Sequence, residues 1–384
     1  MKLIYITNTR IPSEKANARQ SMKMCNAFAE IYDHVEMWTG QARNTHEMKA
    51  IKDPFIFYNI QKNFYIAFLY QIDSILLARI NEFIWANMKA ISFAISVLLR
   101  LFKTSKSHEF IIYTRVWHVL LVAKLVKLLR ASNFKVIYEA HKFSPLLAKV
   151  ITYSDGLVVI NRFLGKKFSD VGFKNITIEH DSVDITEFEN MKNYEFNDSK
   201  KSYKVIYIGS LSKAKGVYTL ADSGQYLPKE FSIYFYGGST NDLKIFSEYV
   251  SKIAWSKNIF CEKFMPHEKL LQKINDADIL VIPNISGATE NLYTSPMKLF
   301  EYMALRKPIL ASNIKSIREV LNNKNASFFS DNDPKDLAKQ IIFISRNNQT
   351  ERIKQAFNDV KQYTWQRRAA RIKQFISDTS LCAE

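Results

Sequence analysis

The stretch SPMKLFEYMA (295–304) sets a lysine and a glutamate three residues apart in an otherwise apolar run. At helical spacing, Lys298 and Glu301 lie on one face of the same helix. The ammonium group can bind a phosphate or a sugar hydroxyl, and the carboxylate can accept two hydroxyl hydrogen bonds, as from a ribose. The alternative is a surface ion pair, which contributes at most about 0.5 kcal/mol. We favour a ligand site because the apolar remainder of the helix leaves little surface free.

Two polar residues, Thr294 and Ser295, come directly before this helix. Serine is a common N-cap, and Pro296 suits the first helical position. We therefore expect the helix to begin here, with Thr294 and Ser295 presenting hydroxyl and backbone N–H groups to an anion.

The loop SLSKAKG (210–216) follows the apolar run KVIYIG (204–209). Small residues that lead into a helix present backbone N–H groups and the positive end of the helix dipole to a ligand. Lys213 and Lys215 add positive charge, so the loop is a candidate diphosphate site, and solvated loop lysines are the alternative. The loop matches neither the GxxxxGK(S/T) pattern nor the GxGxxG pattern of other nucleotide sites.

A histidine, His141, lies in YEAHKF (138–143), at the end of another apolar run. At the ligand edge of a sheet, its imidazole can hydrogen-bond a substrate hydroxyl or carbonyl group. A histidine with a purely structural role is the alternative.

These residues have to be positioned by strands that alternate with helices. Short β-branched or aromatic runs are separated by segments whose apolar residues recur with a helical period. This alternation favours parallel, doubly wound sheets, in which ligands bind beyond the carboxyl ends of the strands. The expected strands are residues 3–6, 35–39, 55–58, 110–114, 135–139, 156–160, 175–178, 204–209, 231–236, 258–261, 277–283, 308–312 and 326–330.

A polar, turn-rich stretch, EFENMKNYEFNDSKKSY (187–203), interrupts the alternation. Two domains are the prior expectation for a chain of 384 residues. We therefore expect one Rossmann-like domain over residues 1–190 and a second over residues 200–364.

The composition indicates an anionic partner. The chain has 54 Lys and Arg against 37 Asp and Glu, a formal net charge of +17. Such a charge favours nucleic acid, a membrane surface or phosphorylated small molecules. The basic residues form no block typical of a nucleic-acid-binding arm, so we expect no nucleic acid partner. Three separated cysteines without a CxxC pattern indicate neither a disulfide framework nor a structural zinc site.

Residues 63–104 are nearly all helical in pattern, are rich in Phe, Ile and Leu, and run into the basic segment RLFKTSK (100–106). One interpretation is an amphipathic, basic hairpin on an anionic membrane, and the alternative is a pair of core-facing helices. The longest apolar stretches, such as 90–102, are shorter than the roughly 20 residues of a spanning helix. The first residues lack a signal-peptide pattern. We expect a cytoplasmic protein, either soluble or peripheral on the inner face of the plasma membrane.

Taken in order, these segments resemble the glycosyltransferase family 4 type of GT-B enzyme over nearly the whole chain. The segments that carry the resemblance are 6–30, 138–143, 154–161, 180–188, 207–216, 264–270, 295–304 and 363–372. The resemblance implies two Rossmann-like domains that face a cleft. It also implies that residues 365–384 form a final helix that crosses back to the first domain.

The activity that the resemblance implies is a retaining transfer of a hexosyl or related group from a nucleotide-sugar. The acceptor would be a lipid-linked or surface-polysaccharide glycan, and neither a metal nor a cofactor is expected. By position, Lys215 would hold the donor diphosphate and Glu301 the nucleotide ribose. The backbone of Thr294 and Ser295 would meet the phosphates.

Further residues are implied by the same positions. Phe264 and Met265 would flank the nucleotide base, and His141 would face the transferred sugar. The catalytic residues would then be His141, Lys215 and Glu301. The loop near the diphosphate and the acceptor would consist of Ala16, Asn17 and Ala18.

Three positions depart from the family pattern. Ser210 stands where arginine is common, so one of two phosphate cations is missing, and Lys213 is the candidate substitute. Tyr293 replaces the first glutamate of an E-x7-E pair, and Lys142 replaces an aspartate. Two other functions therefore stay open: a nucleotide-sugar-binding protein that has lost catalysis, and a nucleotide-sugar 2-epimerase.

Overall fold

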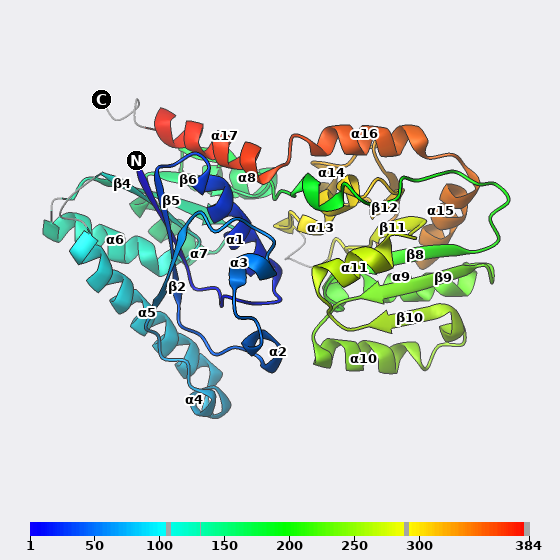
Figure 1. Cartoon of the computed structure of the whole chain (residues 1–384), viewed down its shortest axis with the longest axis horizontal. Helices are drawn as coiled ribbons and strands as arrows, with labels where there is room; N and C mark the ends of the chain where they lie inside the picture. Colours follow the sequence, from blue (N-terminus) through cyan, green and yellow to red (C-terminus); the bar gives the residue numbers. More distant parts are fainter. Residues whose placement is uncertain (105–108, 131, 288–291, 380–384) are drawn as a thin grey trace. The chain divides into compact units, whose positions relative to one another are not determined.

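The chain forms two compact units in a computed structural model that describes residues 1–104, 109–130, 132–287 and 292–379 (Figure 1). Unit 1 comprises Met1–His180 and Trp365–Glu384, and unit 2 comprises Asp181–Thr364. Residues 181–190, which the sequence assigned to the first domain, therefore belong to unit 2.

Among the described residues, unit 1 contains a seven-stranded parallel sheet in the order β3-β2-β1-β4-β5-β6-β7. Its strands are β1 (Lys2–Thr7), β2 (His34–Gly40), β3 (Tyr65–Leu69), β4 (Phe110–Thr114), β5 (Phe134–Ala140), β6 (Gly156–Val159) and β7 (Ile176–Ile178). Its helices are α1 (Ala16–Ala29), α2 (His46–Lys49), α3 (Pro54–Phe57), α4 (Ile75–Ile80), α5 (Glu82–Thr104), α6 (Trp117–Arg130), α7 (Pro145–Val150), α8 (Arg162–Asp170) and α17 (Trp365–Asp378).

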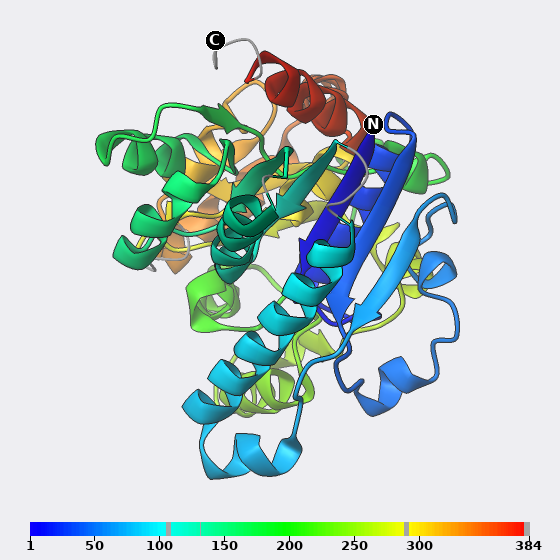
Figure 2. The ribbon, with the colours of Figure 1, turned by 90° about the vertical axis from the view of Figure 1, so that its left-hand side faces the viewer.

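The strand order of unit 1 reverses between β1 and β4. Right-handed crossovers put α1, which follows β1, and α6, which follows β4, on opposite faces of the sheet. Accordingly, α1 packs against α17, whereas α6 packs against α5, which lies along unit 1 with α4 at its first turn (Figure 2). Because both faces are covered, β4 and β6 are buried at every residue and read as continuous apolar runs.

The third strand of this sheet is not where the sequence predicted it. Residues 55–58 were expected to be a strand, but they fall within and just after the short helix α3. Asp53 accepts a hydrogen bond from the backbone N–H of Phe55, and Pro54 occupies the first helical turn, so local capping outweighs the β-propensity of the aromatic residues. The strand lies instead at β3, within the region 63–104 that was expected to be nearly all helical.

Over the same described ranges, unit 2 contains a six-stranded parallel sheet in the order β10-β9-β8-β11-β12-β13. Its strands are β8 (Tyr203–Ile208), β9 (Phe231–Tyr236), β10 (Ile259–Glu262), β11 (Ile279–Ile282), β12 (Ile309–Ser312) and β13 (Ser327–Phe329). Its helices are α9 (Val217–Ser223), α10 (Thr240–Val250), α11 (His267–Ile274), α13 (Met297–Ala304), α14 (Lys315–Arg318), α15 (Pro334–Arg346) and α16 (Thr350–Val360).

Each face of the unit 2 sheet carries its own apolar core. Successive residues of β8 alternate between them: Val205 and Tyr207 pack with residues of α9 and α15, and Ile206 packs with residues of α13 and α16. The strand order reverses between β8 and β11, so the loops after these two strands start from the point of reversal. The predicted α/β architecture of two Rossmann-like units is confirmed.

The last helix, α17, returns to unit 1 as the resemblance implies. Its buried face consists of Trp365, Arg368, Ala369, Ile372 and Ile376. This face completes one side of the unit 1 core beside α1.

We predict that Ile372→Ala lowers the free energy of unfolding of unit 1 by about 2–5 kcal/mol, because it leaves a cavity under α17. Urea unfolding followed by tryptophan fluorescence measures this, since Trp38, Trp85, Trp117 and Trp365 lie in unit 1 and only Trp255 lies in unit 2. The matched control is Gln374→Ala, an exposed position of the same helix, with a change within about 0.5 kcal/mol. Equal effects of the two substitutions would contradict the packing of α17.

Candidate functional site

In unit 2, the pairing of β8 with β11 ends early, at the point where the strand order reverses. The two strands pair only through Val205 with Ile279 and Ile206 with Leu280. Beyond these pairs, the backbone N–H of Ile208 donates to the hydroxyl of Tyr302 in α13, at 2.9 Å. The hydroxyl therefore anchors α13 beside the end of β8, where ligands bind in sheets of this type.

The ammonium group of Lys298, on α13, is buried beside the end of β8. Its Nζ lies 4.0 Å from the ring centroid of Tyr207. In the part of the chain that the structure describes, no hydrogen-bond acceptor meets this nitrogen. Burial lowers the pKa of Lys298 well below its ordinary value, nearby Lys215 lowers it further, and Glu301 opposes the shift. Lys215 and Glu301 thus lie within electrostatic reach of Lys298, and we call the three residues the donor-side cluster.

Two glycines let the backbone approach this cluster. Gly209 has φ +140°, and a Cβ there would come within 3.0 Å of Lys298 Nζ. Gly216 has φ +70°, and a Cβ there would lie 1.7 Å from the carbonyl oxygen of Pro283, at the end of β11. Only glycine fits both positions. Gly216 allows the loop after β8 to pack closely against Pro283, and Gly209 leaves room for the ammonium group of Lys298.

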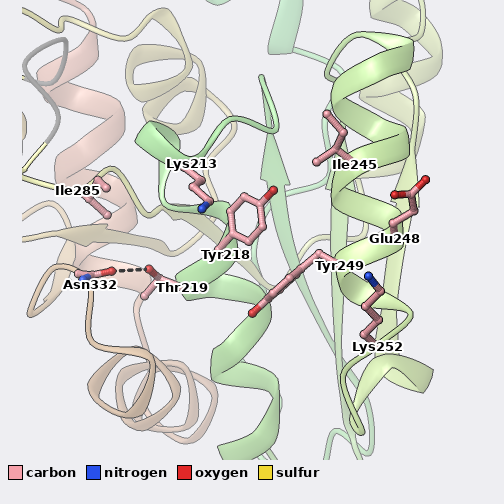
Figure 3. A pocket seen from close by; sticks show the side chains of 9 residues that line it. All are labelled: Lys213, Tyr218, Thr219, Ile245, Glu248, Tyr249, Lys252, Ile285 and Asn332. Atoms are coloured by element: carbon pink, nitrogen blue, oxygen red, sulfur yellow. Dashed lines mark hydrogen bonds between the residues drawn. The ribbon is translucent and has the colours of Figure 1, made fainter.

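The other basic residue of the predicted phosphate loop, Lys213, lies elsewhere. Its side chain lines a hollow of 630 Å³ (Figure 3), with Nζ 5.8 Å from the ring centroid of Tyr218. The hollow is also lined by Thr219, Ile245, Glu248, Tyr249, Lys252, Ile285 and Asn332. Ser210 is exposed, and its carbonyl accepts a hydrogen bond from the Tyr207 hydroxyl at 2.7 Å. Lys298, rather than Lys213, is therefore the second ammonium group beside Lys215.

The predicted cap of the Lys298 helix is wrong. The helix begins at Met297, with Pro296 at the N-cap and no side-chain cap. The Ser295 hydroxyl instead accepts a hydrogen bond from the backbone N–H of Asp181, at 2.9 Å. This bond ties the first residue of unit 2 to the loop after β11, and Thr294 lies partly buried beside it.

Two expected base-contacting residues, Phe264 and Met265, follow the edge strand β10. The side chain of Phe264 is 41% exposed, whereas Met265 packs against the core that includes α13. Both lie beyond the carboxyl end of a strand, two strands from β8.

In unit 1, His141 follows β5 and contacts a buried carboxylate. Its Nε2 lies 2.5 Å from Oε1 of Glu139, whose side chain is fully buried. The amide of Gln20 donates to the same oxygen at 3.0 Å, and the hydroxyl of Tyr113 donates to Oε2. Arg368 of α17 is also fully buried and lies 3.1 Å from Oε2. We call these residues the Glu139 network.

The protonation states in this network follow from burial and charge. Burial by itself raises the pKa of Glu139, but Arg368, His141 and Arg115 hold it well below its usual range. Burial lowers the pKa of His141 to about 4, and Arg115 adds to this lowering, although Glu139 opposes it. At neutral pH the imidazole is therefore neutral, and donating Nε2–H to Glu139 leaves Nδ1 as an acceptor. With 26% of its side chain exposed, His141 can accept a hydrogen bond from a hydroxyl.

Sequence reasoning singled out His141 and missed the partners that fix its ring. The signal was present, because Glu139 is a charged residue near the end of a strand predicted to be buried. Buried carboxylates need charged or hydrogen-bonding partners. Nothing in the sequence, however, indicates that the partner is Arg368 rather than one of the many other cations.

The expected acceptor-side loop also differs. Ala16, Asn17 and Ala18 form the first turn of α1 rather than a loop. Asn17 donates from its side-chain amide to the Thr9 hydroxyl at 3.2 Å, and Ala18 is buried. The irregular segment after β1 is therefore residues 8–15. Among the described residues of both units, no three His, Cys, Asp or Glu side chains are grouped as metal ligands.

Residues 189–359 match the family of glycosyl transferases group 1. The matched segment contains β8 to β13 and the whole donor-side cluster. None of the curated protein sequences matches this chain.

Three solved structures illustrate which proteins have a similar fold. Sucrose-phosphate synthase from Thermosynechococcus elongatus has a TM-score of 0.74 and 15% identity, with all of both chains covered. Anabaena HepE in complex with UDP has a TM-score of 0.71 and 13% identity, covering 98% of this chain and 100% of HepE. The lipopolysaccharide outer core galactosyltransferase WaaB has a TM-score of 0.68 and 14% identity, covering 98% of this chain and 99% of WaaB. These likenesses confirm the predicted GT-B fold.

We predict that Lys298→Met raises the free energy of unfolding of the ligand-free protein by about 1–3 kcal/mol. Methionine removes a buried donor that has no acceptor in the described part of the chain, and it keeps much of the side-chain length. Urea unfolding followed by circular dichroism measures the change. Lys339→Met, at an exposed position of α15, is the control and should change stability by less than about 0.5 kcal/mol. A loss of stability in Lys298→Met would show that the ammonium group is satisfied in the free protein.

We predict that Arg368→Met destabilises unit 1 by about 3–5 kcal/mol, because it leaves the Glu139 carboxylate buried without its main counter-charge. Tryptophan fluorescence during urea unfolding reports the change. Arg367→Met, an exposed neighbour on α17, should have little effect. Similar stabilities of the two variants would rule out a compensating role for Arg368.

Proposed function

We propose that this protein is a glycosyltransferase that moves a sugar from a nucleotide-sugar to an acceptor hydroxyl. The donor-side cluster carries the proposal: a buried ammonium group, with a second lysine and a carboxylate within electrostatic reach, lies where the strand order reverses, within the segment that matches group 1 glycosyl transferases. A buried ammonium group that meets no acceptor among the described residues is suited to bind an anion that enters from outside.

The proposed donor chemistry follows from charge. Departure of the leaving group puts negative charge on the nucleotide diphosphate, and positioned cations stabilise that charge most strongly where water is excluded. Lys215 and Lys298 would supply the positive charge, and Glu301 would accept hydrogen bonds from the ribose hydroxyls. The backbone of Thr294 and Ser295 would meet the phosphates, and Phe264 with Met265 would flank the base.

We further propose a retaining, family 4 type of transfer of a hexosyl or related group. His141 would accept a hydrogen bond at Nδ1 from a hydroxyl of the transferred sugar, with Glu139 fixing its ring. Because the cations already neutralise the diphosphate, the proposal includes neither a bound metal nor a cofactor.

The proposed acceptor is a lipid-linked or surface-polysaccharide glycan, and α1 with Ala16, Asn17 and Ala18 would lie on the acceptor side. A cytoplasmic protein, peripheral on the inner face of the plasma membrane, is the location we propose. The similarity of fold to WaaB, a lipopolysaccharide galactosyltransferase, supports this choice.

A second candidate is a nucleotide-sugar-binding protein without transferase activity. Ser210 and Tyr293, which replace an arginine and a glutamate of the family pattern, favour it. A nucleotide-sugar 2-epimerase would use the same donor-side cluster and differs only in its product.

We predict that UDP, the nucleotide bound to HepE, raises the melting temperature, and that Lys215→Ala, Lys298→Met and Glu301→Ala each weaken its binding. A charge-assisted hydrogen bond contributes about 1.5–3 kcal/mol, so each substitution should raise Kd about 10–100-fold. Isothermal titration with UDP, GDP, ADP and CMP measures these constants. Lys339→Ala is the control. Unchanged Kd for the preferred nucleotide in all three variants would remove the proposed donor site.

Incubation with UDP-sugars, followed by proton NMR, separates the three functions. A transferase releases UDP and forms a glycoside with the anomeric configuration of the donor, with or without EDTA. A 2-epimerase changes the sugar without acceptor, and a binding protein leaves the donor unchanged. An inverted product would contradict the retaining mechanism, and activity abolished by EDTA would contradict metal independence.

A further inference from the structure

We propose that α4, α5 and α6 of unit 1 form a face that binds in the plane of an anionic lipid bilayer. We call it the α4–α6 face. This inference identifies the surface that would hold the protein at the membrane. It stands apart from the donor chemistry, since it would apply to a transferase and to a binding protein alike.

Large apolar side chains lie exposed along all three helices. Their exposed fractions range from 39% for Trp117 to 77% for Phe83. On α5, Phe83, Ile91, Ile95 and Leu99 recur at intervals of four or eight residues and so form a stripe along the helix. The exposed apolar residues are Leu76, Ile80, Phe83, Ile84, Ile91, Ile95, Leu99, Trp117, Leu121, Leu125, Leu128 and Leu129.

These side chains are additional to those that form the core. The inner side of α5 is already filled by Phe93, Val97 and Leu101, each at most 1% exposed, and α6 buries a similar set. The three helices are neighbours, since α4 packs on α5 and α5 packs on α6 (Figure 2). So many exposed apolar side chains on adjoining helices indicate an interaction site rather than chance exposure.

The charge of the face identifies its partner. The three helices contain one acidic residue, Glu82, against seven basic ones: Arg79, Lys89, Arg100, Lys103, Lys124, Lys127 and Arg130.

Three of these cations pair with carboxylates outside the helices, namely Lys89 with Asp73, Arg100 with Glu36 and Lys127 with Asp155. The other four are exposed and, among the described residues, form no ion pair: Arg79, Lys103, Lys124 and Arg130. Lys124 and Arg130 lie over the rings of Tyr153 and Phe102, but these contacts leave their charges without a carboxylate partner in the described part of the chain. Apolar side chains flanked by such cations match the acyl and headgroup layers of an anionic membrane.

The same charges argue against a second copy of this chain. A symmetric dimer through this face would bring together, from each copy, the four cations that form no ion pair among the described residues, and Glu82 is the one acidic residue that the three helices offer to oppose them. An anionic bilayer instead supplies phosphate groups for all of them.

The helix α5 would lie on the bilayer rather than cross it. Glu82–Thr104 is long and apolar enough to span a membrane by length and composition. Its second half, however, is fixed to unit 1: Ser96 donates to the carbonyl of Tyr70 at 2.8 Å, and the Arg100 guanidinium stacks 4.8 Å from the Trp38 ring centroid. Leaving the unit would also expose Phe93 and Val97, so binding in the plane preserves contacts that insertion would break.

Co-sedimentation of the full chain with vesicles tests this inference. We expect binding to vesicles of equal parts phosphatidylcholine and phosphatidylglycerol, and much weaker binding to phosphatidylcholine alone or in molar salt. The triple substitution Ile91→Gln, Ile95→Gln and Leu99→Gln should lower the vesicle partition coefficient at least about tenfold, because it removes the apolar stripe. The quadruple substitution of Arg79, Lys103, Lys124 and Arg130 by glutamine should do the same.

Matched controls change equally exposed side chains elsewhere. The control for apolar area is the triple substitution by glutamine of Ile56, Val171 and Phe343. The control for charge is the quadruple substitution by glutamine of Lys229, Lys257, Lys324 and Lys339. Equal partition of the face variants and their controls would overturn the inference, as would equal binding to neutral and anionic vesicles. Retention in the vesicle pellet after alkaline carbonate extraction would overturn in-plane binding.

Two further measurements separate this inference from its rivals. If sedimentation velocity shows a dimer that the Ile91, Ile95 and Leu99 substitutions dissociate, the face is a protein interface and the membrane inference fails. The nucleotide-induced shift in melting temperature should be the same in the face variants and the wild type. A face variant that loses vesicle binding but keeps the nucleotide-induced shift in melting temperature therefore reports only on the α4–α6 face. A wild type that shows no such shift reports only on the donor site.

Discussion

Burial of a single ammonium group constrains the structure around the donor-side cluster. A donor without an acceptor destabilises a folded protein by about 1–3 kcal/mol, and a charged group costs more. Lys298 is kept in that state by its neighbours: Tyr207 lies under the nitrogen, and Tyr302 anchors α13 to β8. The carboxylate of Glu301 raises the pKa of Lys298, whereas the positive charge of Lys215 lowers it. Rigid strands and a short helix thus hold the group in place, so the diphosphate that we propose as its ligand would meet a site that is already arranged.

Unit 1 buries a group of the opposite charge, the Glu139 carboxylate, and surrounds it with partners. The Glu139 carboxylate is met by Arg368, Gln20, Tyr113 and His141, so its charge is compensated within the protein. Such a network contributes rigidity and orientation more than affinity for a ligand. The contrast explains why we assign binding to the lysine and positioning to the glutamate.

Much of the architecture could be read from the sequence, because buried parallel strands are continuous apolar runs. The helix at α3 could not, since a two-residue cap, Asp53 and Pro54, decided its conformation against the preference of the aromatic residues. The predicted start of α13 was wrong because of a contact distant in sequence: the Ser295 hydroxyl accepts a hydrogen bond from the backbone N–H of Asp181 and therefore does not cap the helix. For the donor-side cluster, the sequence predicted Lys213, Lys215, Lys298 and Glu301 together. That the Lys298 ammonium group is buried near Lys215, whereas Lys213 lines a separate hollow, depends on side-chain directions that spacing does not determine.

Unit 1 consists of two separate segments of the chain, because Asp181–Thr364 is inserted between His180 and Trp365. Arg368, the counter-ion of Glu139, therefore belongs to the last segment of the unit to be translated. While a nascent chain emerges from the ribosome, the first 180 residues have an acidic group in their interior and no arginine from α17 to neutralise it. Unit 2, whose residues are contiguous, is fully translated at Thr364, before α17 has been made. Maturation of unit 1 is then a late event that waits for residues 365–378.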